Sequence, residues 1–278
     1  MIYLGKFNRL TILRETSVGL FLGDEEGTDI LLPNKYMPGT YTIGDQLDVF
    51  CYLDHQERPV ATTLKPYIER DQFALLRVAE VNEIGAFLDW GLEKHMLVPF
   101  KEQRFKMVEG QSYVVYCYLD EVTFRLVASN KLDKFLSNES VDLEVGQEVA
   151  VLLTRESDLG WDVIVNNTHK GLVYANEVFK KLAVGDRLKG YVKKIRDDQK
   201  LDISLQPIGL AVIEPSSQHI IDYLKNGGGF MQLHDNSSPE EIKEALQMSK
   251  KTFKKALGSL YKSKLVRLEV DGVYLNEN

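Results

Sequence analysis

An internal repeat is the feature that most constrains the fold of this chain of 278 residues. Five landmark residues recur after 66 positions: Gly19, Pro33, Gly44, Cys51 and Asp54 are matched by Gly85, Pro99, Gly110, Cys117 and Asp120. A third copy follows at an offset of 75, in which Gly160, Leu172, Tyr174 and Gly185 match Gly85, Leu97, Pro99 and Gly110. Each copy of such a repeat is one structural unit. The first 208 residues therefore contain three related small units.

Each unit has the pattern of a small β-barrel. In the second unit, apolar segments of strand composition lie at residues 73–81, 86–90, 95–100, 113–119 and 124–128, with glycines at the bends. Short strands in so small a unit bury their edges by closing on themselves. We therefore expect a mainly β fold, with three tandem five-stranded barrels at residues 1–65, 66–138 and 139–208.

The pattern changes after Pro207. Residues 211–217 contain a proline and two serines, which predicts a joint. Apolar spacing and turn residues predict helices at 219–225, 239–246 and 250–262, a short strand at 230–233, and a hairpin of 266–270 with 273–275 around Asp271-Gly272. This order is typical of a winged helix, so residues 215–278 are assigned to an α+β winged-helix domain.

Short motifs recur in the barrel units. The third unit has Lys170-Gly171-Leu172-Val173-Tyr174, then Val184-Gly185-Asp186, and a closing Asp202-Ile203-Ser204-Leu205, and the second unit has Ile84-Gly85-Ala86-Phe87-Leu88. With these motifs the units resemble the S1 RNA-binding domain, which is an oligonucleotide-binding (OB) fold; the third unit is the most similar and the first the most divergent. Three S1-like units before a winged helix are similar to the conserved virulence factor B family of Gram-positive bacteria. That resemblance implies RNA binding and an influence on the expression of virulence genes.

Composition limits the kind of nucleic-acid site. The formal net charge is −7, which argues against a chain that binds polyanions over its whole surface. Any site must be a local basic patch that also uses stacking on aromatic rings. The N-terminal residues lack the apolar core of a signal peptide and no apolar run approaches the length of a membrane span, so we expect a cytoplasmic protein. Cys51 and Cys117 are expected to be unpaired buried thiols, because they occupy equivalent places in two separate units.

The sequence predicts no catalysis and no cofactor. Gly227-Gly228-Gly229 lacks the Lys-Ser/Thr that follows a phosphate-binding loop, and no GxSxG motif is present. The five histidines are scattered without metal-ligand spacing. We therefore expect neither an enzyme nor a metal protein.

Candidate RNA-binding residues come from the S1 resemblance and from basic stretches. In the S1 family the functional positions are aromatics before and after the second-strand glycine, a His on the third strand, and an Asp and an Arg on the last hairpin. The candidates are Phe21, Arg58, Phe87, Arg125, Trp161, Tyr174, Arg187, Lys189, Tyr191, Lys193, Lys194, Lys200, Lys250, Lys251, Lys254 and Lys255. The units depart from the family at Val18, Pro33, Ile84, Pro99 and Asp162, so no single unit has a complete site.

Each candidate also has a structural interpretation. Phe21, Phe87 and Trp161 could equally be core residues of alternating strands. Arg58 and Arg125 could form cross-strand ion pairs with Asp54 and Asp120 that close a hairpin, which we favour slightly over contact with RNA. The basic residues 187–196 could form a solvated outer face, although a rail along the RNA backbone is somewhat better supported in so acidic a chain.

The leading hypothesis from the sequence is a noncatalytic regulator that binds single-stranded RNA through the barrels and the winged helix. A second hypothesis is a DNA-binding transcription regulator that acts through the winged helix. The helix of residues 250–262 argues against operator recognition, because it has no Arg, Asn or Gln for bidentate base contacts. A third hypothesis is a scaffold that docks on the ribosome or on the RNA-degradation machinery.

Overall fold

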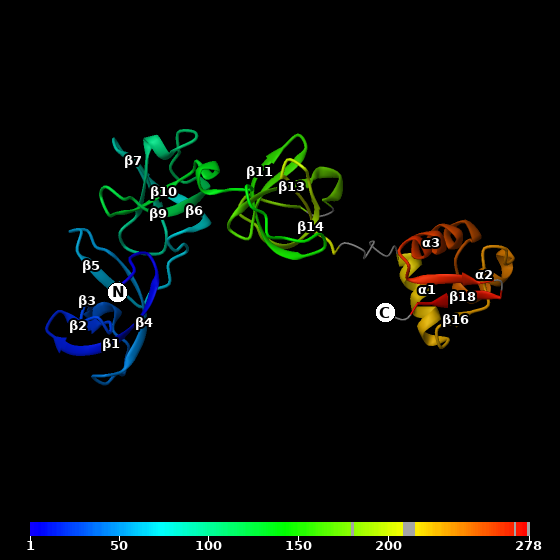
Figure 1. Cartoon of the computed structure of the whole chain (residues 1–278), viewed down its shortest axis with the longest axis horizontal. Helices are drawn as coiled ribbons and strands as arrows, with labels where there is room; N and C mark the ends of the chain where they lie inside the picture. Colours follow the sequence, from blue (N-terminus) through cyan, green and yellow to red (C-terminus); the bar gives the residue numbers. More distant parts are fainter. Residues whose placement is uncertain (179–180, 208–214, 270, 277–278) are drawn as a thin grey trace. The chain divides into compact units, whose positions relative to one another are not determined.

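The computed structural model describes residues 1–178, 181–207, 215–269 and 271–276. Residue contacts divide the chain into two units: one holds Met1–Asp142, Ala150–Leu188 and Arg196–Leu201, and the other holds Leu143–Val149, Lys189–Ile195 and Asp202–Asn278. The described strands form three closed five-stranded barrels and a C-terminal three-stranded sheet, which is accompanied by three α-helices (Figure 1). The predicted mainly β fold with a terminal winged helix is confirmed. The proposed domain boundaries stay predictions.

The three barrels share one strand order. Barrel 1 consists of β1 (Phe7–Thr16), β2 (Gly19–Gly23), β3 (Asp29–Pro33), β4 (Gln46–Leu53) and β5 (Pro59–Thr62). Barrel 2 consists of β6 (Gln72–Val81), β7 (Gly85–Asp89), β8 (Met96–Pro99), β9 (Ser112–Leu119) and β10 (Leu126–Ser129). Barrel 3 consists of β11 (Glu148–Ser157), β12 (Gly160–Val165), β13 (His169–Tyr174), β14 (Arg187–Ile195) and β15 (Leu201–Ser204). Around each barrel the order is first, second, third, fifth, fourth, so equivalent strands can be compared directly.

A glycine at the start of each second strand allows the second and third strands to approach closely. Gly19, Gly85 and Gly160 have φ angles of +146°, +158° and +142°. A Cβ atom on them would lie 2.1, 2.3 and 2.0 Å from a backbone carbonyl oxygen of the third strand. No side chain fits at such a distance, and L-residues rarely adopt this φ. The repeated glycine is therefore a requirement of barrel closure.

A 3₁₀ turn follows the third strand of every barrel, and the sequence analysis did not predict it. The turns are η1 (Asn34–Tyr36), η2 (Phe100–Glu102) and η4 (Ala175–Glu177). Pro33 and Pro99 precede the first two with φ near −59° and −58°. The ring of proline favours this φ, which explains why proline recurs at this position in the first two units.

Apolar cores lie inside the barrels and between barrels 1 and 2. Leu10, Leu20 and Leu32 are at most 2% exposed and belong to the core of barrel 1. A second cluster holds the core of barrel 2 and extends to Phe50 and Tyr52 of barrel 1. The ring of Trp90 lies 5.7 Å from that of Phe50 and 6.2 Å from that of Tyr52, both edge-on. Barrels 1 and 2 are thus joined by an aromatic cluster, within the first unit.

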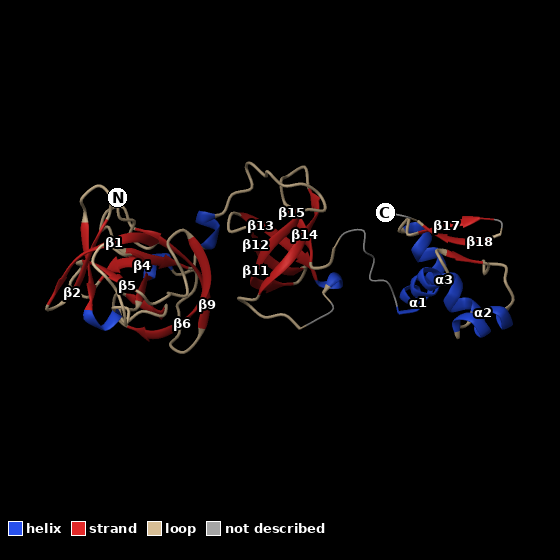
Figure 2. Ribbon diagram, turned by 90° about the horizontal axis from the view of Figure 1, so that it is seen from below, coloured by secondary structure: helices blue, strands red, loops and turns tan. Residues whose placement is uncertain are grey.

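The C-terminal domain has the predicted winged-helix order (Figure 2). Its elements are α1 (Pro215–Asn226), β16 (Phe230–Met231), α2 (Pro239–Leu246), α3 (Lys250–Lys262), β17 (Val266–Glu269) and β18 (Gly272–Leu275), and the sheet order is β16-β18-β17. Helix α2 starts with a capping box: the Ser238 hydroxyl accepts from Glu241 N at 3.2 Å, and the Glu241 carboxylate accepts from Ser238 N at 2.7 Å. Phe253 and Leu257 of α3 pack against Leu224 of α1 in one core.

The predicted joint at residues 211–217 is wrong for its last three residues. Residues 211–214 lie outside the described part of the chain, whereas residues 215–217 already belong to α1. Proline is compatible with the first turn of a helix, because the amide it lacks has no helical partner there. Pro215 therefore opens the helix instead of ending a linker.

The repeated glycine should tolerate no side chain. Gly85→Ala would place a methyl group 2.3 Å from the carbonyl oxygen of Val98, so we expect a loss of about 3 kcal/mol or more in unfolding free energy. Gly39→Ala is the matched control, because a Cβ there meets no atom within 4 Å. Urea denaturation followed by circular dichroism checks both variants. Equal midpoints for the two variants would contradict the steric argument.

Both cysteines should be unreactive in the folded protein. Cys51 and Cys117 are free and buried, and burial raises the pKa of each thiol to about 12. The reactive thiolate is then a minute fraction at pH 8. Iodoacetamide at pH 8, followed by mass spectrometry, should modify neither residue in buffer and both in denaturant. Modification in buffer at the rate of a free thiol would show that the barrels open readily.

Candidate nucleic-acid interface

A row of three outward side chains crosses the first three strands of every barrel. In barrel 1 Phe21 of β2 pairs with Arg14 of β1 and with Leu31 of β3. In barrel 2 the row is Glu80, Phe87 and Leu97, and in barrel 3 it is Arg155, Asp162 and Leu172. Phe21, Phe87 and Asp162 are all partly exposed. This is the face on which OB barrels bind single strands.

The ring of Phe21 is already covered by a cation. The Arg14 guanidinium lies 4.1 Å from the centre of this ring, and it also pairs with Asp29 at 2.8 Å. Such a contact is attractive because the ring face is electron-rich. A base that stacks on Phe21 must share or displace the arginine.

The last hairpin of each barrel presents one basic residue in the same place. The residue that opens each hairpin donates its backbone N–H to the carbonyl of the basic residue: Asp54 to Arg58, Asp120 to Arg125 and Arg196 to Lys200. The preceding residue has a positive φ in all three, +61°, +53° and +60° for Glu57, Phe124 and Gln199. The structure therefore places Lys200 at the position of the two arginines, and Arg196 at the position of the aspartates.

The structure gives each of these basic residues a carboxylate partner. Arg58 pairs with Asp54 at 2.7 Å, which is the cross-strand ion pair considered from the sequence. Arg125 does not pair with Asp120, so the cross-strand pair considered for the second unit is wrong: Arg125 reaches Glu57 of barrel 1 at 3.1 Å, while Asp120 accepts hydrogen bonds from Val122 N and Thr123. Lys200 pairs with Asp198 at 2.7 Å.

The structure brings Phe87 and Arg125 together in one cavity of about 230 Å³. Its other walls include Ile84 and Leu97 of barrel 2, and Tyr52 of barrel 1. Glu57 lies at this cavity and also accepts a 3.0 Å bond from Lys94. The strand face of barrel 2 therefore contains a largely apolar hollow. The Glu57 carboxylate of barrel 1 forms ion pairs with two basic residues of barrel 2, Arg125 and Lys94. A cavity of about 270 Å³ on barrel 1 includes Arg58 but not Phe21.

Trp161 lies at a core position. Its side chain is 8% exposed, and the repeat aligns it with Leu20 and Ala86, which are both fully buried. Burial favours the core interpretation of Trp161 over stacking on a base. Tyr174 remains partly exposed, and its hydroxyl accepts a hydrogen bond from Arg196, whose guanidinium carbon lies 5.9 Å from the ring centre.

The basic strand β14 alternates as expected, with Arg187, Lys189, Tyr191 and Lys193 at exposed or partly exposed positions. Part of the positive charge of this strand is neutralised by an ion pair. Lys189 pairs with Glu148 at 2.8 Å and Tyr191 donates to the same carboxylate at 3.3 Å, while Arg187 donates to the carbonyl of Phe73. The hydrogen bond from Lys189 lowers the pKa of Glu148. Lys193 and Lys194 are exposed.

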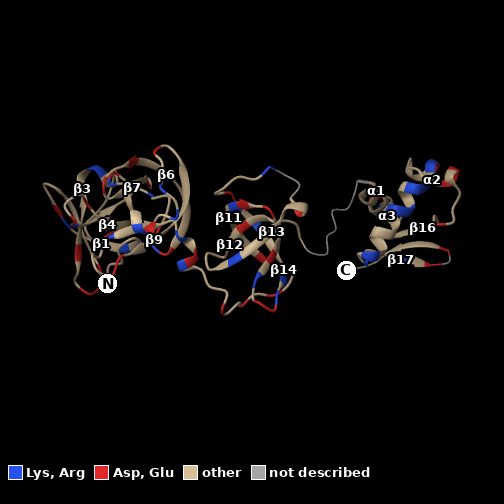
Figure 3. Cartoon of the chain, turned by 90° about the horizontal axis from the view of Figure 1, so that it is seen from above, with Lys and Arg blue, Asp and Glu red and all other residues tan. Residues whose placement is uncertain are grey.

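Helix α3 carries lysines on its outer side (Figure 3). Lys251, Lys254 and Lys255 are exposed, and Lys250 is partly exposed. Their helix is fixed by its buried side and by Ser249, which accepts from Thr252 N at 3.1 Å. On the hairpin that forms the wing, Arg267 lies 4.7 Å from the ring centre of Tyr274.

The sequence analysis missed Phe124. It was predicted to begin the last strand of barrel 2, but β10 begins at Leu126. Phe124 instead stands in the hairpin loop, 64% exposed and with φ of +53°. OB barrels use this loop as well as the strand face, and the signal available in the sequence was an aromatic residue, Phe124, directly before Arg125.

The described residues contain no cluster of three or more His, Cys, Asp and Glu side chains that could hold a metal. In the same part of the chain, no helix has both the length and the apolar character needed to cross a membrane.

Comparisons with known proteins agree with this architecture. A CvfB-like winged helix domain matches residues 218–275, and an S1 domain matches residues 4–64. The protein YitL of Bacillus subtilis (strain 168) is 30% identical over 278 residues, which span 95% of this chain and 91% of YitL. The chain belongs to the conserved virulence factor B family.

More distant family members cover most of the chain as well. Conserved virulence factor B of Staphylococcus aureus (strain USA300) is 26% identical over 248 residues, or 84% of this chain and 81% of that protein. The crystal structure of a multidomain protein with nucleic acid binding domains from Streptococcus pneumoniae TIGR4 is 27% identical, with 98% coverage of both chains and a TM-score of 0.45. With its S1 and winged-helix domains, this chain is a nucleic-acid-binding protein.

Removal of the Glu57 carboxylate should strengthen nucleic-acid binding. Glu57→Gln would release Arg125 and Lys94 for phosphate, so we expect affinity for a single strand to rise about two- to five-fold at low salt, with less effect at high salt. Fluorescence anisotropy with a labelled oligonucleotide measures this change. Glu109→Gln, which removes the same charge from an exposed turn, is the control. An equal gain in both variants would mean that net charge alone is responsible.

Proposed function

We propose that this chain is a noncatalytic, cytoplasmic RNA-binding protein that holds single-stranded RNA on its tandem barrels and its winged helix. Through this binding it regulates gene expression after transcription, virulence genes among them. The observation that carries the proposal is the cavity of barrel 2, which Phe87 of the strand face and Arg125 of the last hairpin both line. An aromatic ring beside a cation is the arrangement that stacks a base and holds its phosphate.

Single strands fit this surface better than a duplex does. The partly exposed Phe21 and Phe87 can stack only on bases that are not paired within a helix. The Arg, Asn and Gln side chains that read base edges in the major groove are absent from α3, which offers lysines for phosphate. We therefore assign α3 to contact with the RNA backbone.

Affinity should come from several weak sites acting together. No barrel has the full S1 residue set, and the basic residue of each last hairpin is already ion-paired. Linked weak modules gain affinity because the second binding event is intramolecular. On this view the strand engages barrels 2 and 3 and the winged helix together. The candidate residues other than the buried Trp161 act as contacts spread along one strand.

The alternative function is DNA-binding transcription regulation through the winged helix. The lysines of α3 favour it, because this helix is the one that enters the major groove in helix-turn-helix proteins. The two functions differ in which domain is indispensable. Docking on the ribosome or on RNA-degradation machinery would instead show as co-purification that survives nuclease treatment.

Binding to a single-stranded RNA in a salt titration tests the proposal. Phe87→Ala should weaken binding by about five-fold or more, because one stacked base is lost. Tyr67→Ala, at a side chain that is 64% exposed, should leave binding unchanged. Truncation after residue 207 should retain most RNA binding. No binding at low salt, or loss of all binding on truncation together with tight binding to duplex DNA, would refute the RNA proposal and favour the alternative.

A further inference from the structure

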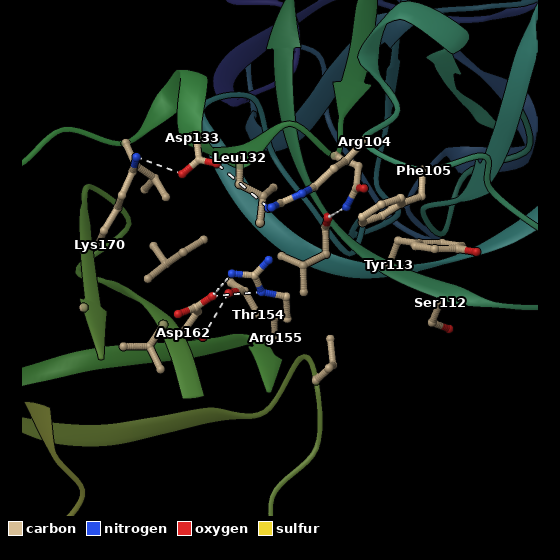
Figure 4. Close-up of a pocket in the computed structure, with 17 residues that line it drawn as sticks. Arg104, Phe105, Ser112, Tyr113, Leu132, Asp133, Thr154, Arg155, Asp162 and Lys170 are labelled. Atoms are coloured by element: carbon tan, nitrogen blue, oxygen red, sulfur yellow. Dashed lines mark hydrogen bonds and ion pairs between the residues drawn. The ribbon is translucent and has the colours of Figure 1, made fainter. Parts of the chain in front are cut away.

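A cavity of about 450 Å³ lies between barrels 2 and 3, with all of its lining residues in the first unit (Figure 4). Phe105 and Tyr113 line it from barrel 2, while Arg155, Asp162 and Lys170 line it from barrel 3. The segment that connects the two barrels contains the 3₁₀ turn η3 (Leu132–Phe135), and Asp133 of this turn also lines the cavity. The volume is in the range of sites that hold small organic ligands.

The walls of this cavity are held by packing and by hydrogen bonds. Phe73 and Val114 of barrel 2 form one buried cluster with Leu152 and Ile164 of barrel 3. Asn167 joins the two backbones: its Oδ1 accepts from Phe73 N at 3.2 Å and its Nδ2 donates to the carbonyl of Asp71 at 2.8 Å. A preformed site loses less conformational entropy when it binds.

The polar side chains of the cavity carry a net positive charge. Asp133 accepts from Lys170 at 2.8 Å and lies 4.0 Å from Arg104, while Asp162 accepts from Arg155 Nε at 2.9 Å. Three cations and two carboxylates leave a charge of +1, in a chain whose net charge is −7. The three cationic side chains are 47%, 49% and 53% exposed, so they can also face a ligand.

Barrel 3 has no aromatic residue at the outward position of its second strand, but aromatic residues of barrel 2 lie on the other side of this cavity. Asp162 stands where barrels 1 and 2 have Phe21 and Phe87, so the strand face of barrel 3 has no ring of its own at this position. Figure 4 shows Phe105 and Tyr113 across the cavity from Asp162 and Arg155. Phe105 is 69% exposed, and Tyr113 is held by a 3.2 Å hydrogen bond from Val108 N to its hydroxyl.

We propose that this cavity is a composite nucleotide site, in which one unstacked base of single-stranded RNA lies against Phe105 while Arg155, Lys170 and Arg104 hold the adjoining phosphates. Barrel 2 supplies the ring and barrel 3 supplies the strand face. This inference rests on the proposed function and adds to it the place where the strand passes from one barrel to the next. It also explains why an apolar ring as large as Phe105 is exposed in a cavity that three cations line as well.

Full-length protein and a labelled single-stranded oligoadenylate test this site by fluorescence anisotropy. Phe105→Ala should weaken binding about five-fold or more, whereas Phe105→Trp should retain it. Phe100→Ala is the matched control, because Phe100 is 44% exposed in the same barrel and does not line the cavity. The fluorescence of Phe105→Trp should change on RNA addition beyond any change in the wild type, whose Trp90 and Trp161 are buried. AMP is the free-nucleotide arm and should bind far more weakly than the oligonucleotide.

The outcomes separate the composite site from the proposed function. If the wild type binds the oligonucleotide but Phe105→Ala binds as well as Phe100→Ala does, the composite site is wrong and the RNA-binding proposal stands. If the wild type binds no RNA at low salt, both fail. If AMP binds as tightly as the oligonucleotide and alone alters the fluorescence of Phe105→Trp, the cavity is a site for a free nucleotide and the strand-crossing proposal is overturned.

Discussion

The close approach of the second and third strands is the constraint on which each barrel depends. At Gly19, Gly85 and Gly160 a carbonyl oxygen of the neighbouring strand occupies the space of a Cβ atom. The approach fixes the register of the two strands, and the register in turn sets the outward positions of Phe21, Phe87 and Asp162. The geometry of the nucleic-acid face therefore follows from a contact between backbone atoms, in which no candidate RNA-binding side chain takes part.

Several basic residues of the candidate nucleic-acid face form ion pairs with carboxylates of the same chain. Arg58, Arg125, Lys189 and Lys200 all have a carboxylate partner within 3.1 Å. These pairs are exposed, and exposed pairs contribute little to stability. A phosphate can therefore replace the carboxylate with little loss. Such an exchange reconciles an acidic chain with a nucleic-acid-binding family, and it makes discrimination depend more on stacking than on total charge.

Most of the architecture could be predicted from the sequence, because it rests on local patterns. The glycine spacing located the barrels, and the ends of α2 and α3 were predicted to the residue, since caps and apolar spacing act within one helix. The candidate site was less accessible. Burial of Trp161, the turn of Arg125 toward Glu57 and the cavity at Phe105 all depend on contacts between residues that lie far apart in the sequence. Periodicity carries no information about such contacts.

The unequal repeat offsets come from connecting segments of different length. Nine residues separate β5 from β6, whereas 18 separate β10 from β11. The longer connection contains η3, whose Asp133 pairs with Lys170 of barrel 3. The third module has an aspartate in place of the aromatic residue, and the segment that connects it to barrel 2 forms part of the surface that the two barrels share. The copies therefore differ in the length of a linker as well as in the residues of the barrels.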